Sequence, residues 1–361
     1  ISKKKNFRVT MIVGDLFAGV GGMSEGFLMA GGFDIAFAVE FDKEIADAYQ
    51  RNHIGTEVLA ENICDIDVKS LHTKYPTIDV IIGGPPCQGF SQKGKRLNLD
   101  DPRNFLFQQY VRFVAEFKPK YFVLENVPNI ITTSNGYFKK QIVTAFEKLG
   151  YKVTYGVLCA ADFGVPQERR RAVFMGQLGD MLTLSLPTPN GTHTTIKDAI
   201  YDLPFIESGE GTEQSVYTTT PFSSYQKELR GNCNVLYNHV ATKHSPKAIE
   251  KLRMIPKGAG KEVLPTELLT KSIYSGTWCR MIEDGLSITI TTRFDTPSSG
   301  RFTHPILNRC ITVREAARIQ SFPDNYIFYG SKGAQMKEVG NAVPPFLARA
   351  IAKEILKNER K

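Results

Sequence analysis

Short apolar runs with polar flanks recur through the first half of the chain and predict buried strands. They lie at 11–17, 35–39, 80–82, 121–124, 151–158 and 172–176. Helical spacing of apolar residues fills 104–117 and 138–149 between some of them. Because buried strands that alternate with helices are typical of a covered parallel sheet, the pattern predicts an α/β fold with a doubly wound, mostly parallel sheet.

The pattern changes beyond about residue 179. Pro, Thr, Ser and Gly become frequent, and only 246–253 has helical spacing and only 287–292 resembles a strand. A helix is expected at 311–321, where Thr312 and Glu315 have the spacing of a capping box. The apolar stripe of the last helix, 346–356, should pack on the first domain. These features predict domains at 8–178 and 179–308, and a C-terminal segment at 309–361 that returns to the first domain.

One strand ends in a stretch that presents a thiol. Gly83–Ser91 reads GGPPCQGFS, so Cys87 follows a buried strand on a loop that two prolines stiffen. From the residues alone, a buried structural cysteine is the alternative to a nucleophile. The strand at 121–124 leads to Glu125, and parallel strands place their carboxyl ends at one edge of the sheet. We therefore expect Glu125 and Cys87 on one rim, although Glu125 could also be a helix cap or an ion-pair partner.

A second strand end carries a glycine-rich turn. Asp15–Gly22 reads DLFAGVGG and precedes a helix, and Glu40 ends the next strand about 25 residues after the first. This is the arrangement of a nucleotide-type pocket, in which the carboxylate holds ribose hydroxyls. The GxGG spacing differs from the dinucleotide fingerprint and suits a cofactor without phosphate, such as S-adenosylmethionine. Asp65 could accept an adenine amine, with Ile66 or Phe41 against the ring; a structural turn is the alternative.

Composition narrows the setting. The net charge of +8 is compatible with a polyanionic partner, and the polar, basic stretch at 92–103 predicts a loop that could close over a nucleic-acid backbone. Six cysteines are scattered without CxxC pairs, which argues against disulfides and against a zinc site. No apolar run is long enough to span a membrane. We expect a cytoplasmic protein with no bound metal.

In the run at 169–171, the side chains of Arg169 and Arg171 should face one way and that of Arg170 the other.

Taken together, these blocks resemble the DNA cytosine-5 methyltransferases of bacterial restriction-modification systems. The matching blocks, in the order typical of that family, are 15–22, 40, 65–66, 83–91, 103–107, 125–127, 167–171, 312–323 and 340–345. The resemblance implies a Rossmann-like methyltransferase sheet, and it places the variable target-recognition region at 179–308. The expected function is sequence-specific DNA cytosine-5 methylation within such a system.

The resemblance also implies roles for single residues. Cys87 would add to C6 of a cytosine flipped out of the duplex, and C5 would then take the methyl group from S-adenosylmethionine. Glu125 would hold the N3 and N4 edge of the base. Arg169 would donate to O2, with Arg171 assisting at that edge or at a phosphate. We expect no metal ion at this site.

For the cofactor, the resemblance places Glu40 on the ribose and Asp65 on the adenine amine. The other implied cofactor contacts are Phe17, Gly19, Phe41, Ile66, Gly84, Leu106, Asn341 and Val343. For DNA, Gln88 would fill the space that the flipped base leaves. The remaining implied DNA contacts are Ser91, Lys95, Arg96 and Arg103.

Three other readings compete with this one. An RNA cytosine methyltransferase would share the catalytic blocks, but the Cys-Phe-Thr signature associated with the tRNA-modifying branch is absent. A silent DNA-binding regulator should lack Cys87 or Glu125. A nicotinamide-dependent oxidoreductase would have no use for the Pro-Pro-Cys loop. We expect double-stranded DNA as partner, a monomer associated with the nucleoid through DNA, no membrane, and a cognate restriction endonuclease that acts separately.

Overall fold

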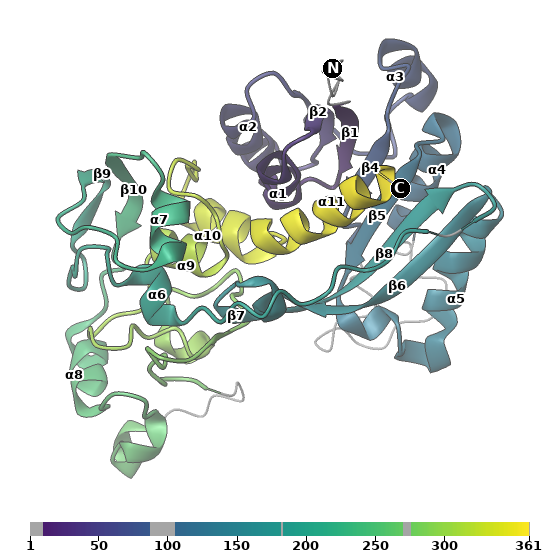
Figure 1. Ribbon diagram of the computed structural model, residues 1–361. Coiled ribbons are helices and arrows are strands. Elements are labelled where there is room, and N and C mark those ends of the chain that lie inside the picture. Colours follow the sequence, from purple (N-terminus) through teal and green to yellow (C-terminus); the bar gives the residue numbers. More distant parts are fainter. Residues whose placement is uncertain (1–9, 87–104, 182, 270–275, 361) are drawn as a thin grey trace, which may run out of the picture. The chain divides into compact units, whose positions relative to one another are not determined.

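The computed structural model describes residues 10–86, 105–181, 183–269 and 276–360. These residues form two compact units, which Figure 1 colours along the chain. The first unit comprises the residues up to 159 together with 170–189 and the residues from 347 on, and the second comprises 160–169 and 190–346. The domain limits expected from the sequence stay a prediction.

The first unit is built on a seven-stranded sheet with the order β3-β2-β1-β4-β5-β8-β6. Its strands are β1 (Met11–Leu16), β2 (Phe33–Val39), β3 (Glu57–Leu59), β4 (Val80–Gly83), β5 (Tyr121–Asn126), β6 (Tyr151–Cys159) and β8 (Arg170–Leu178). The first five strands in this order pair in parallel, and β8 is antiparallel to both β5 and β6, so six strands run one way and β8 runs the other. The order reverses between β1 and β4, where doubly wound sheets bind ligands. The predicted fold class is confirmed.

The helices of the first unit cover this sheet. They are α1 (Gly22–Ala30), α2 (Lys43–Asn52), α3 (Val68–Lys74), α4 (Phe105–Phe117), α5 (Thr133–Glu147) and most of α11 (Pro345–Glu359). The core between layers is aromatic: Phe122 of β5 stacks on Phe146 of α5 with ring centroids 3.8 Å apart. Gly176 of β8 makes room for this pair, because a β-carbon there would lie 1.8 Å from the Phe122 ring.

The second unit has shorter elements. Its helices are α6 (Ile196–Ile200), α7 (Ser224–Arg230), α8 (Pro246–Met254), α9 (Val313–Ile319) and α10 (Lys332–Asn341). The strands β9 (Gly211–Val216) and β10 (Val235–Val240) pair antiparallel, and β7 (Gln167–Glu168) pairs with β11 (Ser287–Ile288). Short 3₁₀ helices of this unit lie at Ala160–Phe163, Lys261–Val263, Thr266–Leu268 and Pro297–Ser299, and one of the first unit lies at Pro128–Ile130. The sequence did not predict α6, α7, β9 or β10, and the strand expected at 287–292 is shorter than predicted.

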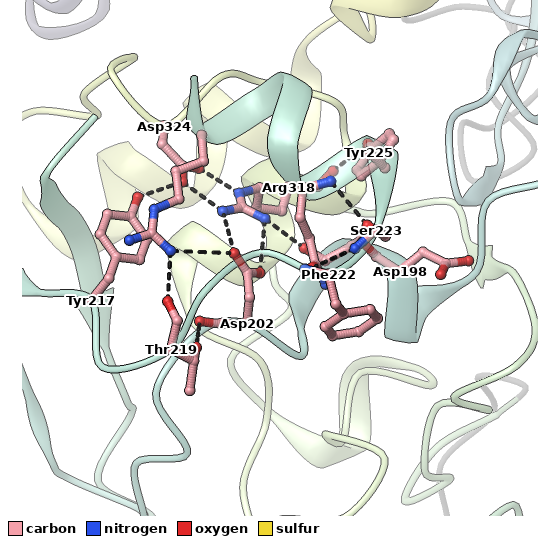
Figure 2. Close-up of polar contacts among 12 residues, drawn as sticks. Asp198, Asp202, Tyr217, Thr219, Phe222, Ser223, Tyr225, Arg318 and Asp324 are labelled. Carbon is pink, nitrogen blue, oxygen red and sulfur yellow. Dashed lines mark hydrogen bonds and ion pairs between the residues drawn. The ribbon is translucent and has the colours of Figure 1, made fainter. Parts of the chain in front are cut away.

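Buried charge holds much of the second unit together. The predicted capping box is confirmed: the Thr312 hydroxyl accepts from the Glu315 N–H, and the Glu315 carboxylate accepts from the Thr312 N–H. Figure 2 shows Arg318 of the fully buried helix α9 between the carboxylates of Asp202 and Asp324. Tyr217 donates to Asp324 in the same cluster. None of the described helices is both long and apolar enough to cross a membrane.

Candidate active site

The ends of β4 and β5 lie side by side and bring Glu125 next to the proline loop. The two strands pair in parallel through Gly83 and Leu124. A β-carbon on Gly84 would lie 2.9 Å from Glu125 Oε2, so the loop passes close to the carboxylate and a larger residue there would displace it. Asn126 Nδ2 donates to the Pro85 carbonyl at 2.9 Å and ties the loop to β5. Cys87 follows two residues later and, with Gln88, Ser91, Lys95, Arg96 and Arg103, lies outside the described residues.

Glu125 forms an ion pair, one of the alternatives that the sequence left open, with a partner that the sequence did not identify. Arg171 Nε lies 2.7 Å from Glu125 Oε1, and the two side chains are only 14% and 13% exposed. Strand β8 runs antiparallel to β5, with Val173 opposite Glu125, so Arg171 reaches across from the neighbouring strand. Burial reduces solvent screening of this pair relative to one at the surface. The pair fixes a carboxylate at the end of β5 beside Gly84.

The other arginines of the run differ from Arg171. Arg169 is 1% exposed, and its two terminal nitrogens each donate at 3.0 Å to a backbone carbonyl, of Ile290 and of Gly340. Arg170 is exposed, which agrees with the expected alternation along the run. Within the second unit, Arg169 therefore joins the segment before β8 to the ends of β11 and α10.

The glycine-rich turn lies between β1 and α1 and contacts Glu40. Phe17, Gly19 and Gly21 all have positive φ, of 57°, 55° and 94°. The Gly19 N–H donates to Glu40 Oε2 at 2.9 Å, and the Asp42 N–H donates to Glu40 Oε1 at 2.8 Å. Burial raises the pKa of Glu40, and these backbone donors oppose that rise. The carboxylate is thus held at the edge of the turn, as the sequence predicted for its position.

The groups beside this turn fit a nucleoside. The backbone N–H groups of Gly19, Asp42 and Phe41 hydrogen-bond the Glu40 carboxylate, whose two oxygens offer about four lone-pair sites, so an acceptor site is left for a ribose hydroxyl. A β-carbon on Gly19 would meet nothing within 4 Å, so there is open space above the turn. Phe41 is 73% exposed, which offers a ring face for stacking. Asp65 is exposed on the turn after β3.

The other expected cofactor residues differ in their exposure. Ile66 is buried in the core of the first unit, and Leu106 packs against that core. Asn341 is exposed and Val343 is 9% exposed, and both belong to the second unit. Asp65 lies in a turn that begins three residues after β3, and its N–H donates to the Asn62 carbonyl at 2.9 Å.

Comparison with known proteins gives a consistent result. The model of the family described as C-5 cytosine-specific DNA methylase matches residues 11–357. Type II methyltransferase M.DdeI of Desulfomicrobium norvegicum is 39% identical over 94% of this chain and 87% of its own length. Type II methyltransferase M1.HphI of Haemophilus parahaemolyticus is 38% identical over 99% of this chain and 90% of its own.

A solved structure extends the likeness to the fold. A protein described as a DNA modification methyltransferase encoded within a prophage of E. coli superposes with a TM-score of 0.80 at 28% identity, over 97% of this chain and 100% of that one. The family match spans both units and includes every block on which the sequence resemblance was based. The chain belongs to the C-5 cytosine-specific DNA methylase family and is a DNA (cytosine-5) methyltransferase.

Proposed function

We propose that the protein methylates C5 of cytosine within one specific sequence of double-stranded DNA, using S-adenosylmethionine and Cys87 as the nucleophile. The observation that supports this most is the Glu125–Arg171 pair beside the Gly84–Pro85 loop. A carboxylate and a guanidinium offer a donor and acceptor set for the polar edge of a cytosine. The loop that carries Cys87 starts from an anchored backbone next to them.

The proposed steps follow from the chemistry of these groups. The Cys87 thiolate forms a bond to C6, and the electron pair of the C5–C6 double bond moves to C5. Glu125 hydrogen-bonds the N3 and N4 edge and stabilises the proton that N3 takes up as charge develops. S-adenosylmethionine, when bound, supplies an electrophilic methyl group. C5 would bond to that methyl group as S-adenosylhomocysteine leaves. The C5 proton would then pass to a base, N3 would give back its proton, and the C5–C6 double bond would re-form as the thiolate departs from C6.

The two arginines receive different parts in this proposal. Arg171 is partly exposed and already pairs with Glu125, so we assign it to O2 of the base. The expectation that Arg169 contacts O2 remains a hypothesis, but its burial and its two carbonyl acceptors favour a framework role instead. An arginine that is 1% exposed would have to break both bonds to reach a substrate.

The cofactor would bind at the turn between β1 and α1. Glu40 would hold the ribose, Phe41 and Ile66 the adenine faces, and Asp65 its amine, with Phe17, Gly19, Gly84, Leu106, Asn341 and Val343 completing the pocket. Open space over Gly19 and the exposed Phe41 ring support this assignment. The small exposed area of Ile66 makes it the weaker of the two adenine contacts.

The remaining parts of the proposal concern the setting. Gln88, Ser91, Lys95, Arg96 and Arg103 would contact DNA, and the second unit would read the target sequence. The relatives named Type II methyltransferases support a role as the modification enzyme beside a separate restriction endonuclease. We propose a monomer in the cytoplasm, associated with the nucleoid through DNA; the free thiols among the described cysteines suit a reducing compartment.

The test is methyl transfer from labelled S-adenosylmethionine to mixed-sequence duplex DNA, with the position of the label read by sequencing of 5-methylcytosine. The wild type should label cytosine in one sequence context, and Cys87→Ser should lose at least 10³-fold in rate because serine is a far weaker nucleophile at neutral pH. The variant should still bind S-adenosylhomocysteine, which shows that it is folded. Label that enters RNA and not duplex DNA would contradict the proposal.

A further inference from the structure

A chain of buried hydroxyl groups lies beneath the glycine-rich turn and links three elements of the first unit. Tyr49 of α2 donates its hydroxyl to Ser24 Oγ at 2.7 Å, and Ser24 of α1 donates to Asp15 Oδ2 of β1 at 2.6 Å. All three residues are at most 1% exposed. Burial raises the pKa of Tyr49 well above its ordinary value, so its hydroxyl remains a donor.

The Tyr49 ring also shapes the underside of the turn. It stacks on the His53 ring with centroids 4.2 Å apart, and the two rings lie against Gly21. A β-carbon on Gly21 would come within 2.5 Å of His53 Cε1 and 2.7 Å of Tyr49 Cε2. Gly21 closes the turn by donating to the Ala18 carbonyl at 2.9 Å. The two rings therefore set the position of Gly21 relative to α2 and prevent the turn from moving closer to that helix.

Helix α2 contacts the turn by a second route. Asp42, its N-cap residue, donates its N–H to one oxygen of Glu40, and the other oxygen accepts from Gly19 of the turn. The turn is thus fixed at Gly19 through the start of α2, and at Gly21 through the end of α2. Its three positive-φ residues give it little regular structure of its own. A small shift of α2 would move both contacts together.

We propose that Tyr49 is a positioning residue for the cofactor: by anchoring α2 to Ser24 and supporting Gly21, it sets the affinity for S-adenosylmethionine without touching the ligand. This inference rests on the proposed function, because it assumes that the turn binds that cofactor. The effect should appear as a higher KM for the cofactor and an unchanged kcat, since the reacting groups lie at the ends of β4 and β5.

The test compares two tyrosine variants that lose the same kind of bond. Tyr49→Phe keeps the ring and removes the hydroxyl. Tyr151→Phe does the same at a buried tyrosine that donates to the Pro119 carbonyl at 2.7 Å, at the start of β6. Calorimetric titration with S-adenosylhomocysteine should give a Kd roughly 3–10-fold higher for Tyr49→Phe, as expected for one buried hydrogen bond. Tyr151→Phe should bind like the wild type.

Further variants guard against a purely structural explanation. Ser24→Ala removes the acceptor of the same bond, so it should weaken binding similarly, and combining it with Tyr49→Phe should add little. His53→Phe keeps a flat ring under Gly21 and should bind like the wild type, whereas His53→Ala should not. Equal affinities for Tyr49→Phe and Tyr151→Phe would overturn the inference alone. Failure of the wild type to bind S-adenosylhomocysteine would overturn the proposed function as well.

Discussion

The two units bury acidic side chains in opposite ways. In the first unit, Asp15 is held by a serine hydroxyl, and burial raises the pKa of Asp15 and of Glu25 to about 7. In the second unit burial also acts on Glu315 and Asp324, but Arg309 and Arg318 outweigh it and hold both pKa values below their ordinary range. The first kind of buried acid resists ionisation, and the second is kept ionised.

This difference follows from what each unit has for a core. The first unit encloses a large apolar cluster around a seven-stranded sheet. The cost of burying a carboxyl group is therefore small relative to the stability that apolar packing gives this unit. The second unit has short elements, and buried arginines donate hydrogen bonds to backbone carbonyls in its strands and loops. Arg314, for example, donates to the carbonyls of Tyr237, Pro323 and Tyr326. In the second unit, buried ion pairs and charged hydrogen bonds therefore hold the elements in place, as apolar packing does in the first unit.

The largest expected effect comes from breaking the arginine cluster. Arg318→Met should destabilise the second unit by about 3–5 kcal/mol, because Asp202 and Asp324 stay buried without their main donor. Denaturant unfolding should show this as an earlier transition, and limited proteolysis should cut within 190–346 first. A loss below about 1 kcal/mol would mean that the cluster is not what holds this unit.

A smaller effect, with a distinct pH dependence, is expected at Asp15. Its pKa lies near 7 in the folded protein against 3.8 ordinarily, so folding retains a proton that the unfolded chain releases. The stability it contributes is complete below about pH 4 and is lost as the pH rises through 7. Asp15→Asn cannot ionise and can still accept from Ser24.

The stability of Asp15→Asn relative to the wild type should therefore increase between pH 5 and pH 7, by up to roughly 1.4 kcal/mol per pH unit, and should level off above pH 7, where Asp15 is ionised in both states. Thermal unfolding of both proteins at each pH unit measures this. Glu25 titrates in the same range in both proteins and cancels from the difference. A difference that stays constant with pH would refute the assignment of a raised pKa to Asp15.

The smallest effect belongs to an exposed pair of the same charge types. Lys74 Nζ lies 2.6 Å from Glu57 Oε2, with side chains 57% and 34% exposed. Lys74→Met should change stability by less than about 1 kcal/mol, and 1 M salt should remove the change. Chemical denaturation at low and high salt checks this. A loss of stability as large as that of Arg318→Met would show that burial does not explain the difference between the two ion pairs.

The sequence predicted the first unit better than the second for a physical reason. Runs such as 80–82 and 121–124 bury both faces of a strand and leave a clear apolar signal, which placed Glu125 at a strand end. Arg314 and Arg318 carry no such signal, because charged residues in a helix usually face solvent. The Thr312–Glu315 capping box was visible since it depends on local spacing alone.

Parts of the candidate site were hidden for a similar reason. The Glu125–Arg171 pair joins residues of two adjacent strands that lie far apart in sequence, and it depends on their register. The Tyr49–Ser24–Asp15 chain likewise connects three elements through hydroxyl groups that look unremarkable in the sequence. Both required the packed structure to bring their members together.

The position of α11 bears on how the protein is made. Its Glu359 accepts a hydrogen bond from Tyr121 of β5 and pairs with Lys120, and Leu356 lies against Gly32. The ribosome synthesises the strands of the sheet first, then residues 190–346, and most of α11 last. During synthesis the sheet therefore lacks its contacts with α11 until the second unit has been made. Apolar surface stays open during that delay, and such chains are typical clients of chaperones.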